Sequence, residues 1–251
     1  MKKIFNKIFH ALRLARKPDH QAIFEAKISH LPDLKTRFTE IYKINMWGAE
    51  DGITETVSGP GSTLSHTTGI RRSMPALFHQ HGIQSVLDAG CGDFHWMRQV
   101  VAESNVKYIG VDVVEELIAS NTRKYSTDKI EFMSLDITQD DLPRVDLVIC
   151  RECLFHLSND EIADFFRNFL RSQSTFLLTT TYGDTESIRN CDVTTGFFRE
   201  IDLVAAPFNL PHNVIASFED TSEGKPKRKL CLWSREQLQP LFAEKVIQQE
   251  S

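Results

Sequence analysis

The feature that most constrains the fold is a short apolar segment that runs directly into a glycine-rich turn. Residues 86–93 read Val-Leu-Asp-Ala-Gly-Cys-Gly-Asp, and a helix-length segment follows them. Glycine lets the backbone approach a ligand closely, and open α/β sheets bind ligands at the carboxyl ends of their strands. Asp112 closes the next apolar segment, 20 residues after Gly92, where a carboxylate can bind ribose hydroxyls. A tight turn and a solvated acid would explain either feature alone, but both together predict a nucleotide-type cofactor.

Short apolar runs alternate with helix-length segments from residue 85 onward. Strands are expected over 85–88, 108–112, 130–135, 146–150 and 176–181, with helices near 94–103, 114–124 and 159–171. This alternation predicts an α/β fold, a doubly wound Rossmann-like sheet that is mostly parallel and covered on both faces. Runs at 214–218 and 229–233 are expected to complete the sheet as an antiparallel edge, before a helix from Ser234.

The chain before this alternation divides into two parts. Residues 1–46 are expected to form a helical N-terminal extension, with one helix ended by Pro18 and a second over 20–44. Residues 47–83 combine a glycine- and threonine-rich loop with a cap helix over 67–81, which Gly82 closes. The catalytic domain would then span 84–251, with a lid insertion at about 183–213.

The charges at the glycine turn favour one class of nucleotide over another. A dinucleotide fingerprint needs a third glycine at position 95, which is His95, and it places a pyrophosphate on the helix that follows. Asp88 and Asp93 flank this turn and would repel a pyrophosphate. S-adenosylmethionine carries a sulfonium and an ammonium, so the acids favour this cofactor.

At these residues the chain resembles the class I S-adenosylmethionine-dependent methyltransferases, over roughly residues 84–182. Asp88, Gly90 and Gly92 match the acid-x-Gly-x-Gly-x-Gly motif of the family, whereas Phe94 replaces its third glycine. The resemblance implies methyl transfer that leaves S-adenosylhomocysteine, with Asp112 on the ribose. It also implies that Asp136, followed by Ile137, lies at the edge of the adenine, and that 146–150 is the fourth strand.

A narrower likeness, to a bacterial group of small methyltransferases of which some are associated with surface-glycan biosynthesis, extends along most of the chain. It is carried by Trp47-Gly48, the loop 58–63, Ile70-Arg71, Cys91-Gly92-Asp93 with Trp96-Met97, Arg151-Glu152 with His156-Leu157, and Pro207-Phe208 with Leu210-Pro211.

Candidate catalytic residues follow the fourth strand, where an α/β sheet opens its ligand crevice. A hydroxyl acceptor needs a base, and His156 is the candidate, with a structural position at the helix near Ser158 as the alternative. Glu152 is the second catalytic candidate. Arg151 and Arg71 could bind the carboxylate of the cofactor, but an ion pair between Arg151 and Glu152 and a solvated Arg71 fit equally well.

The irregular stretch between Tyr182 and Val214 mixes aromatic and polar residues, as a lid over an acceptor would. Asn190, Asp192, Arg199 and Phe208 are its candidate substrate contacts. The alternative is an irregular excursion that packs its own phenylalanines.

The leading functional hypothesis is O-methylation of a glycan or another small-molecule hydroxyl. N-methylation of a protein or small molecule, an NAD-dependent oxidoreductase and a non-catalytic cofactor-binding module are the alternatives. A net charge of −5 and a pI near 6.0 argue against a nucleic-acid partner. Cys150-x-x-Cys153 has no second pair at ligand spacing, so no metal is expected.

Residues 1–17 contain basic side chains and no acidic one, with apolar residues at helical spacing (Ile4, Phe5, Ile8, Phe9 and Leu12). An amphipathic helix of this kind would hold the protein at the inner face of the cytoplasmic membrane or pack on its own domain. Five cysteines without a disulfide spacing suit the cytoplasm, and no segment has the ~18 apolar residues of a membrane span.

Overall fold

The computed structural model describes residues 20–47, 55–183, 190–220 and 228–242. These residues form a seven-stranded sheet in the order β3-β2-β1-β4-β5-β7-β6, in which only the pairings made by β7 are antiparallel. The strands are β1 (Ser85–Ala89), β2 (Lys107–Asp112), β3 (Ile130–Ser134), β4 (Leu147–Cys150), β5 (Phe176–Tyr182), β6 (Ala216–Glu219) and β7 (Arg228–Ser234). The expected doubly wound α/β fold with an antiparallel edge is confirmed.

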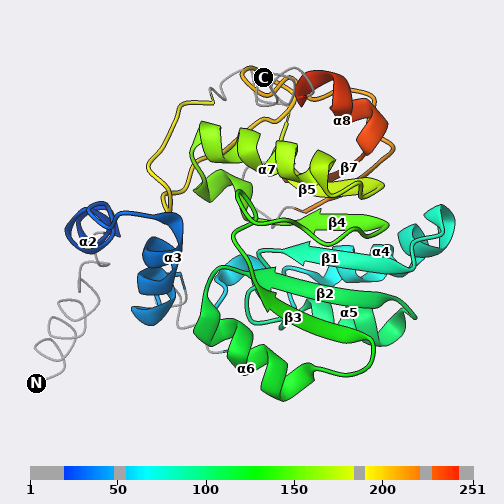
Figure 1. Ribbon diagram of the computed structural model, residues 1–251, viewed down its shortest axis with the longest axis horizontal. Coiled ribbons are helices and arrows are strands. Elements are labelled where there is room, and N and C mark those ends of the chain that lie inside the picture. Colours follow the sequence, from blue (N-terminus) through cyan, green and yellow to red (C-terminus); the bar gives the residue numbers. More distant parts are fainter. Residues whose placement is uncertain (1–19, 48–54, 184–189, 221–227, 243–251) are drawn as a thin grey trace, which may run out of the picture.

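Helices surround this sheet, and α2 and α3 stand beyond the carboxyl ends of its parallel strands (Figure 1). The described helices are α2 (His20–Lys27), α3 (Leu34–Lys43), α4 (Thr68–His81), α5 (Met97–Glu103), α6 (Glu115–Tyr125), α7 (Asn159–Arg171) and α8 (Arg235–Phe242), with the 3-10 turns η1 (Pro60–Ser62) and η2 (Leu154–His156). The cap helix α4 ends as expected, because Gly82 takes the left-handed conformation with φ 63°.

The expectation of a single helix over 20–44 is wrong. Pro32 and Asp33 interrupt it, and the side chain of Asp33 accepts a hydrogen bond from the backbone N–H of Thr36 at 2.8 Å. An N-cap of this kind starts a new helix, and proline removes the donor that a continuous helix would need. The break places α3 where its buried residues Leu34 and Phe38 reach the site described below.

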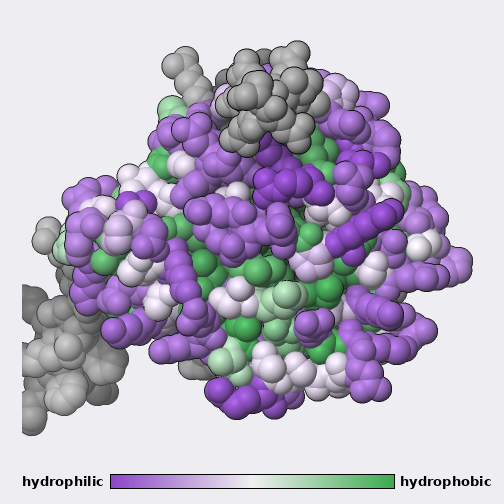
Figure 2. Space-filling view, viewed as in Figure 1, coloured by the Kyte–Doolittle hydropathy of each residue, from purple (hydrophilic) through white to green (hydrophobic). Residues whose placement is uncertain are grey.

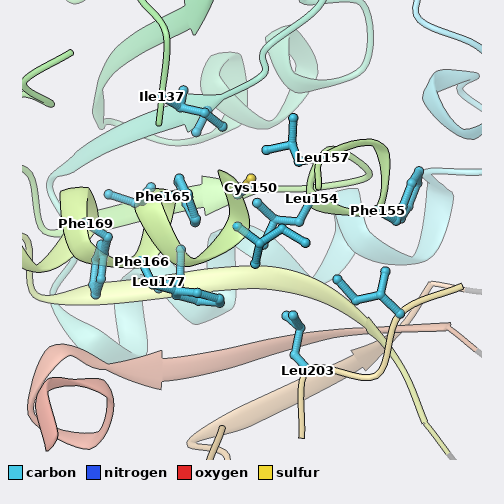
Figure 3. Packing of buried hydrophobic residues seen from close by; sticks show 14 of the residues in the cluster. Ile137, Cys150, Leu154, Phe155, Leu157, Phe165, Phe166, Phe169, Leu177 and Leu203 are labelled. Carbon is cyan, nitrogen blue, oxygen red and sulfur yellow. The ribbon is translucent and has the colours of Figure 1, made fainter. Parts of the chain in front are cut away.

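The core consists of two apolar clusters, one on each face of the sheet. Along β1, Val86 joins the cluster beneath α4 and α5, whereas Leu87 joins the cluster beneath α7. Figure 3 shows Phe165, Phe166 and Phe169 of α7 packed over β4 and β5, where all three are fully buried. A parallel sheet that is buried on both faces requires this continuous apolar sequence in its central strands.

The connection between β3 and β4 contains no helix in residues 135–146, all of which the structure describes. Figure 2 shows apolar side chains gathered in this part of the molecular face, over the strands between α6 and α7 and surrounded by hydrophilic groups. None of the helices in the described ranges is long and apolar enough to cross a membrane. The helix expected over residues 1–17, and with it the membrane contact, lies outside the described residues.

The described part of the expected lid packs largely into the core. Leu203, Phe208 and Leu210 are buried there, and the indole N–H of Trp233 donates to the carbonyl of Pro211 at 2.9 Å. The alternative interpretation, an irregular segment that packs its own apolar side chains, therefore describes most of residues 190–213.

Asp146 joins the starts of β1 and β4, the two strands whose far ends carry the glycine turn and Arg151. Its Oδ2 atom accepts hydrogen bonds from the backbone N–H groups of Gln84 and Ser85 at 2.9 Å and from Ser85 Oγ at 2.8 Å. We expect Asp146→Ala to lower the free energy of unfolding by about 1–3 kcal/mol, because these donors lose their acceptor. Urea denaturation checks this, with the exposed Asp128→Ala as a control that stays within about 0.5 kcal/mol. Equal stability of the two variants would contradict the assignment.

Candidate active site

A cavity of about 760 Å³ opens at the carboxyl ends of β1, β2 and β4. The glycine turn after β1 and the residues that end β2 and β4 form its floor. Side chains of α3, the loop 58–62 and residues 196–200 form its walls. This is the edge at which doubly wound sheets bind their ligands.

The glycine turn needs glycine at both positions that the sequence motif contains. Gly90 and Gly92 have φ values of 81° and 56°. A Cβ on Gly92 would lie 2.2 Å from Ser58 Oγ, so a larger residue would displace the loop that covers the turn.

Phe94 replaces the third glycine of the motif without entering the cavity. It keeps a left-handed backbone with φ 59°, and its ring packs against Tyr108 and Phe132 in the cluster beneath α4 and α5, with centroids 4.7 and 5.1 Å apart. The substitution therefore leaves the floor of the cavity open.

Asp112 and Asp88 place two buried carboxyl groups beside the turn. Asp112 accepts hydrogen bonds from the backbone N–H of Gly92 and of Val114, each at 3.1 Å, and Asp88 accepts from the hydroxyl of Tyr108 at 2.8 Å. Burial raises the pKa of Asp112 to about 6 and that of Asp88 to about 7. Both line the cavity, where a cation would stabilise their ionised forms.

The loop before α4 is fastened onto this turn by Asp93. The Asp93 carboxylate accepts hydrogen bonds from the backbone N–H of Val57 at 3.0 Å and from Ser58 Oγ at 3.2 Å. Tyr42 of α3 approaches Ser58 Oγ to 3.4 Å, so α3, the loop and the turn form one wall. Asp93 thus positions the loop, and its side chain does not line the cavity.

Two expected cofactor contacts lie elsewhere. Arg71 donates to Thr67 Oγ1 at 3.1 Å and to the carbonyl of Leu64 at 2.7 Å, and it also contacts Gln99, which ties α4 to α5 outside the cavity. Asp136 accepts from the backbone N–H and the hydroxyl of Thr138 and so closes its own turn. The next residue, Ile137, does line the cavity.

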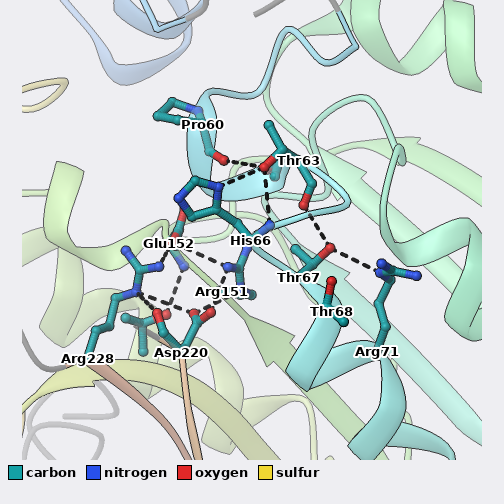
Figure 4. Close-up of polar contacts among 12 residues, drawn as sticks. Pro60, Thr63, His66, Thr67, Thr68, Arg71, Arg151, Glu152, Asp220 and Arg228 are labelled. Atoms are coloured by element: carbon teal, nitrogen blue, oxygen red, sulfur yellow. Dashed lines mark hydrogen bonds and ion pairs between the residues drawn. The ribbon is translucent and has the colours of Figure 1, made fainter. Parts of the chain in front are cut away.

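Arg151 and Glu152 belong to a network of four charged residues (Figure 4), of which three line the cavity and Asp220 lies behind them. Arg151 makes a bidentate pair with Asp220, at 3.0 and 2.8 Å, and lies 3.4 Å from Glu152. Arg228 lies 2.5 Å from Glu152 and 3.4 Å from Asp220. The interpretation of Arg151 as a partner of Glu152 fits this arrangement, and Asp220 and Arg228 are members that the sequence analysis missed.

Glu152 is held in an unusual position within this network. Its backbone has φ 53°, and its N–H donates to Thr180 Oγ1 at 2.9 Å. A Cβ on Gly61 would lie 1.7 Å from the Glu152 carboxylate, so only glycine in the loop allows this carboxylate to stand in the cavity.

His156 lies in the cavity between aromatic walls. Its Nδ1 atom is 3.0 Å from the carbonyl of Phe197, and its ring stacks on Trp47 with centroids 5.0 Å apart. Burial lowers the pKa of His156 to about 4, so the imidazole is neutral at physiological pH. The alternative of a helix cap does not apply, because Ser158 and Glu161 form the capping box of α7.

The four expected substrate contacts hold the chain instead of lining the cavity. The side chain of Asn190 donates to the carbonyls of Asp202 and Ala206, Asp192 accepts from the backbone N–H of Asn159, and Arg199 donates to the carbonyls of Phe155 and Leu157. Phe208 is buried in the core. In this segment Gly196, Phe197, Phe198 and Glu200 line the cavity.

Within the ranges that the structure describes, no group of three or more His, Cys, Asp and Glu side chains could hold a metal ion. Cys150 is buried at the end of β4, and Cys153 lines the cavity beside Gly90.

Comparison with known proteins gives one family match and a set of similar folds. Residues 86–174 match the family model described as a methyltransferase domain. No curated protein matches the sequence.

Among solved structures, magnesium protoporphyrin IX methyltransferase of Synechocystis PCC 6803 with bound S-adenosylmethionine has a TM-score of 0.55 and 16% identity, covering 81% of this chain and 98% of that one. The 1,6-didemethyltoxoflavin-N1-methyltransferase of Burkholderia thailandensis has a TM-score of 0.56 and 17% identity, covering 80% and 86%. Human N-acetylserotonin methyltransferase has a TM-score of 0.56 and 16% identity, covering 92% of this chain and 66% of that one.

The fold is thus shared along the sheet, and the family match covers the segment from β1 to just beyond α7, including the glycine turn, Asp112 and His156. Residues 86–174 are thus similar to a methyltransferase domain, and the fold around them is similar to that of the solved methyltransferases.

Proposed function

We propose that the protein transfers the methyl group of S-adenosylmethionine to a hydroxyl group of a small molecule, a glycan unit included, with His156 as the base. The observation that carries this proposal is a neutral, buried histidine in the same cavity as the glycine turn. A hydroxyl acceptor must lose a proton, and a base in reach of the acceptor removes it.

The cofactor end of the cavity fits the charge and shape of S-adenosylmethionine. Gly90 and Gly92 bring backbone close to the space above β1, and Asp112 offers its carboxylate to ribose hydroxyls. Ile137 supplies an apolar surface for the adenine. The carboxyl groups of Asp88 and Asp112 suit a ligand with positive charge, which a nicotinamide dinucleotide does not bring to this turn.

When bound, the cofactor supplies a methyl group on a sulfonium, a leaving group that is already activated. The protein must hold the acceptor oxygen in line with the bond that breaks, with reacting atoms about 3–3.5 Å apart. The walls formed by α3, the loop 58–62 and residues 196–200 exclude water and fix the acceptor in this position.

The tautomer of His156 follows from its contact with Phe197. A carbonyl oxygen only accepts hydrogen bonds, so Nδ1 carries the proton and Nε2 keeps its lone pair. Stacking on Trp47 holds the ring at a fixed angle. His156 is thus oriented to accept a proton at Nε2.

Glu152 assists the same step. The positive charge that forms on His156 is costly in a buried site, and the Glu152 carboxylate favours it electrostatically. In this proposal Glu152 stabilises the imidazolium, while Arg151 and Arg228 hold the Glu152 side chain in place.

The acceptor atom is tested with S-adenosylmethionine that carries ¹³C in its methyl group. Purified protein is incubated with a small-molecule extract, and the chemical shift of the labelled carbon distinguishes an O-methyl product from an N-methyl product. We expect O-methyl signals that disappear without protein; exclusively N-methyl signals would overturn the hydroxyl assignment and leave methyl transfer intact.

Asp112→Asn is expected to weaken binding of S-adenosylmethionine by about 1.5–3 kcal/mol, the size of a charge-assisted hydrogen bond. Calorimetry measures the affinity, and Asp136→Asn is the matched control, because the Asp136 side chain lies outside the cavity. With a pKa of about 6, Asp112 gains a proton as the pH falls below that value. Wild-type affinity should therefore drop between pH 7 and pH 5 more steeply than that of Asp112→Asn. An equal loss of affinity for S-adenosylmethionine in Asp112→Asn and Asp136→Asn would contradict the assignment.

His156→Ala is expected to lower turnover by roughly 10²–10⁴-fold, because the acceptor proton loses its base. Affinity for S-adenosylhomocysteine should stay nearly unchanged, since His156 is placed on the acceptor side. His79→Ala, an exposed histidine on α4, is the control with normal turnover. Full turnover in His156→Ala would show that proton removal takes place elsewhere.

A further inference from the structure

The mouth of the cavity holds an aromatic side chain that the fold does not bury. Phe198 is 54% exposed, although it is a large apolar residue. Its ring lies 5.1 Å from that of Phe155, 6.5 Å from that of Tyr182 and 6.2 Å from that of His156. An exposed ring at the edge of an aromatic cluster offers its face to a ligand.

Glu200 stands beside these rings on the same side of the chain. Arg199 and Ile201 are buried, whereas Phe198 and Glu200 both line the cavity. The backbone N–H of Tyr182 donates to the carbonyl of Ile201 at 2.8 Å, which fixes this segment next to the end of β5. Among the described residues, Glu200 makes no hydrogen bond or ion pair, and its charge acts on the neighbouring Tyr182.

The other charges on this wall are paired with one another. Arg151 and Arg228 face the carboxylates of Glu152 and Asp220 in the network described above. Within the described residues of this network, the two arginines are therefore balanced by the two acids. The carboxylate of Glu200 adds a negative charge that this network does not neutralise. A partly buried carboxylate in excess favours a positively charged ligand group.

We infer that the acceptor carries a protonated amine together with its hydroxyl group, and that Glu200 binds this amine beside the rings of Phe198 and Tyr182. Aromatic faces attract cations as carboxylates do, so two independent features of the cavity mouth select the same charge. The inference rests on the proposed function and adds the class of acceptor, an amine-bearing alcohol or phenol with an apolar part.

The position of the amine also separates the two candidate acceptor atoms. An ammonium group held by a carboxylate has no lone pair and cannot attack the methyl group. Glu200 and His156 line the same cavity, and the ring of Phe198 lies 6.2 Å from that of His156, so in this inference one small molecule contacts Glu200 with its amine and His156 with its hydroxyl. The amine thus orients the acceptor, and the hydroxyl reacts.

Three phenols of similar shape test this inference: tyramine, which is cationic, tyrosol, which is neutral, and 4-hydroxyphenylacetate, which is anionic. Calorimetry measures their binding to the full chain with and without S-adenosylhomocysteine, after binding of that product alone has been recorded. We expect tyramine to bind about 10-fold more tightly than tyrosol, ~1.4 kcal/mol, and 4-hydroxyphenylacetate to bind most weakly. Glu200→Gln should remove the preference for tyramine, and Glu131→Gln, an exposed acid on β3, should keep it.

The remaining outcomes contradict either the amine site or the proposed methyl transfer. Equal affinities for the three phenols, no detectable binding of tyramine at millimolar concentration, or a preference that persists in Glu200→Gln contradicts the amine site. A chain that shows the charge preference but does not bind S-adenosylhomocysteine contradicts the proposed methyl transfer and leaves the amine site standing.

Discussion

The site depends on how the end of β2 holds the turn that follows β1. The carbonyl of Val111 accepts hydrogen bonds from the backbone N–H groups of Gly90 and Cys91, both at 2.9 Å, and the carboxylate of Asp112 accepts from Gly92. Three successive N–H groups of the turn are therefore satisfied by two residues of the neighbouring strand. Buried backbone donors must be paired, so this arrangement fixes the turn before any ligand arrives. The loop 55–58 binds to the turn through Asp93, and α3 contacts that loop, which makes the cavity walls dependent on the same contact.

The sequence predicts the sheet and the floor of the site because their signals are local. The strand runs, the glycine turn and Asp112 each occupy a few consecutive residues, and strand order places them together. His156 is found for the same reason, since it follows β4 at the carboxyl edge.

The walls of the cavity are harder to predict, because their residues come together from distant parts of the chain. Arg151 pairs with Asp220 across 69 residues, and no periodicity connects the two. Polar residues in the segment after β5 show the opposite error: Asn190 and Arg199 look like ligand contacts, but their side chains satisfy main-chain carbonyls that a segment without regular structure leaves unpaired.

Asp136 and Arg71 show why residue type and approximate position are insufficient. Both residues are close in sequence to residues that line the cavity, and both carry the charge that a cofactor contact needs. Asp136 is followed by Thr138, whose N–H and hydroxyl lie within reach of the carboxylate, so a local turn captures the side chain. Arg71 projects from α4 toward Thr67, one helical turn earlier, and toward α5. In each case the side chain binds a nearby residue of the protein instead of the cofactor. The sequence contains that residue but does not show that it will be the partner.

The depressed pKa of His156 is compatible with the proposed role of this residue as the base, because of how charge would move during methyl transfer. A histidine with a pKa of about 4 is a weak base in the free protein, since burial penalises the imidazolium. In the proposed reaction the sulfonium would become a neutral thioether while the acceptor proton would pass to His156. The positive charge inside the cavity would then be moved and not increased, and the carboxylate of Glu152, which lines the same cavity, would favour it on His156. Burial of His156 keeps the imidazole neutral, and in the proposed reaction the loss of the sulfonium charge would compensate for its protonation.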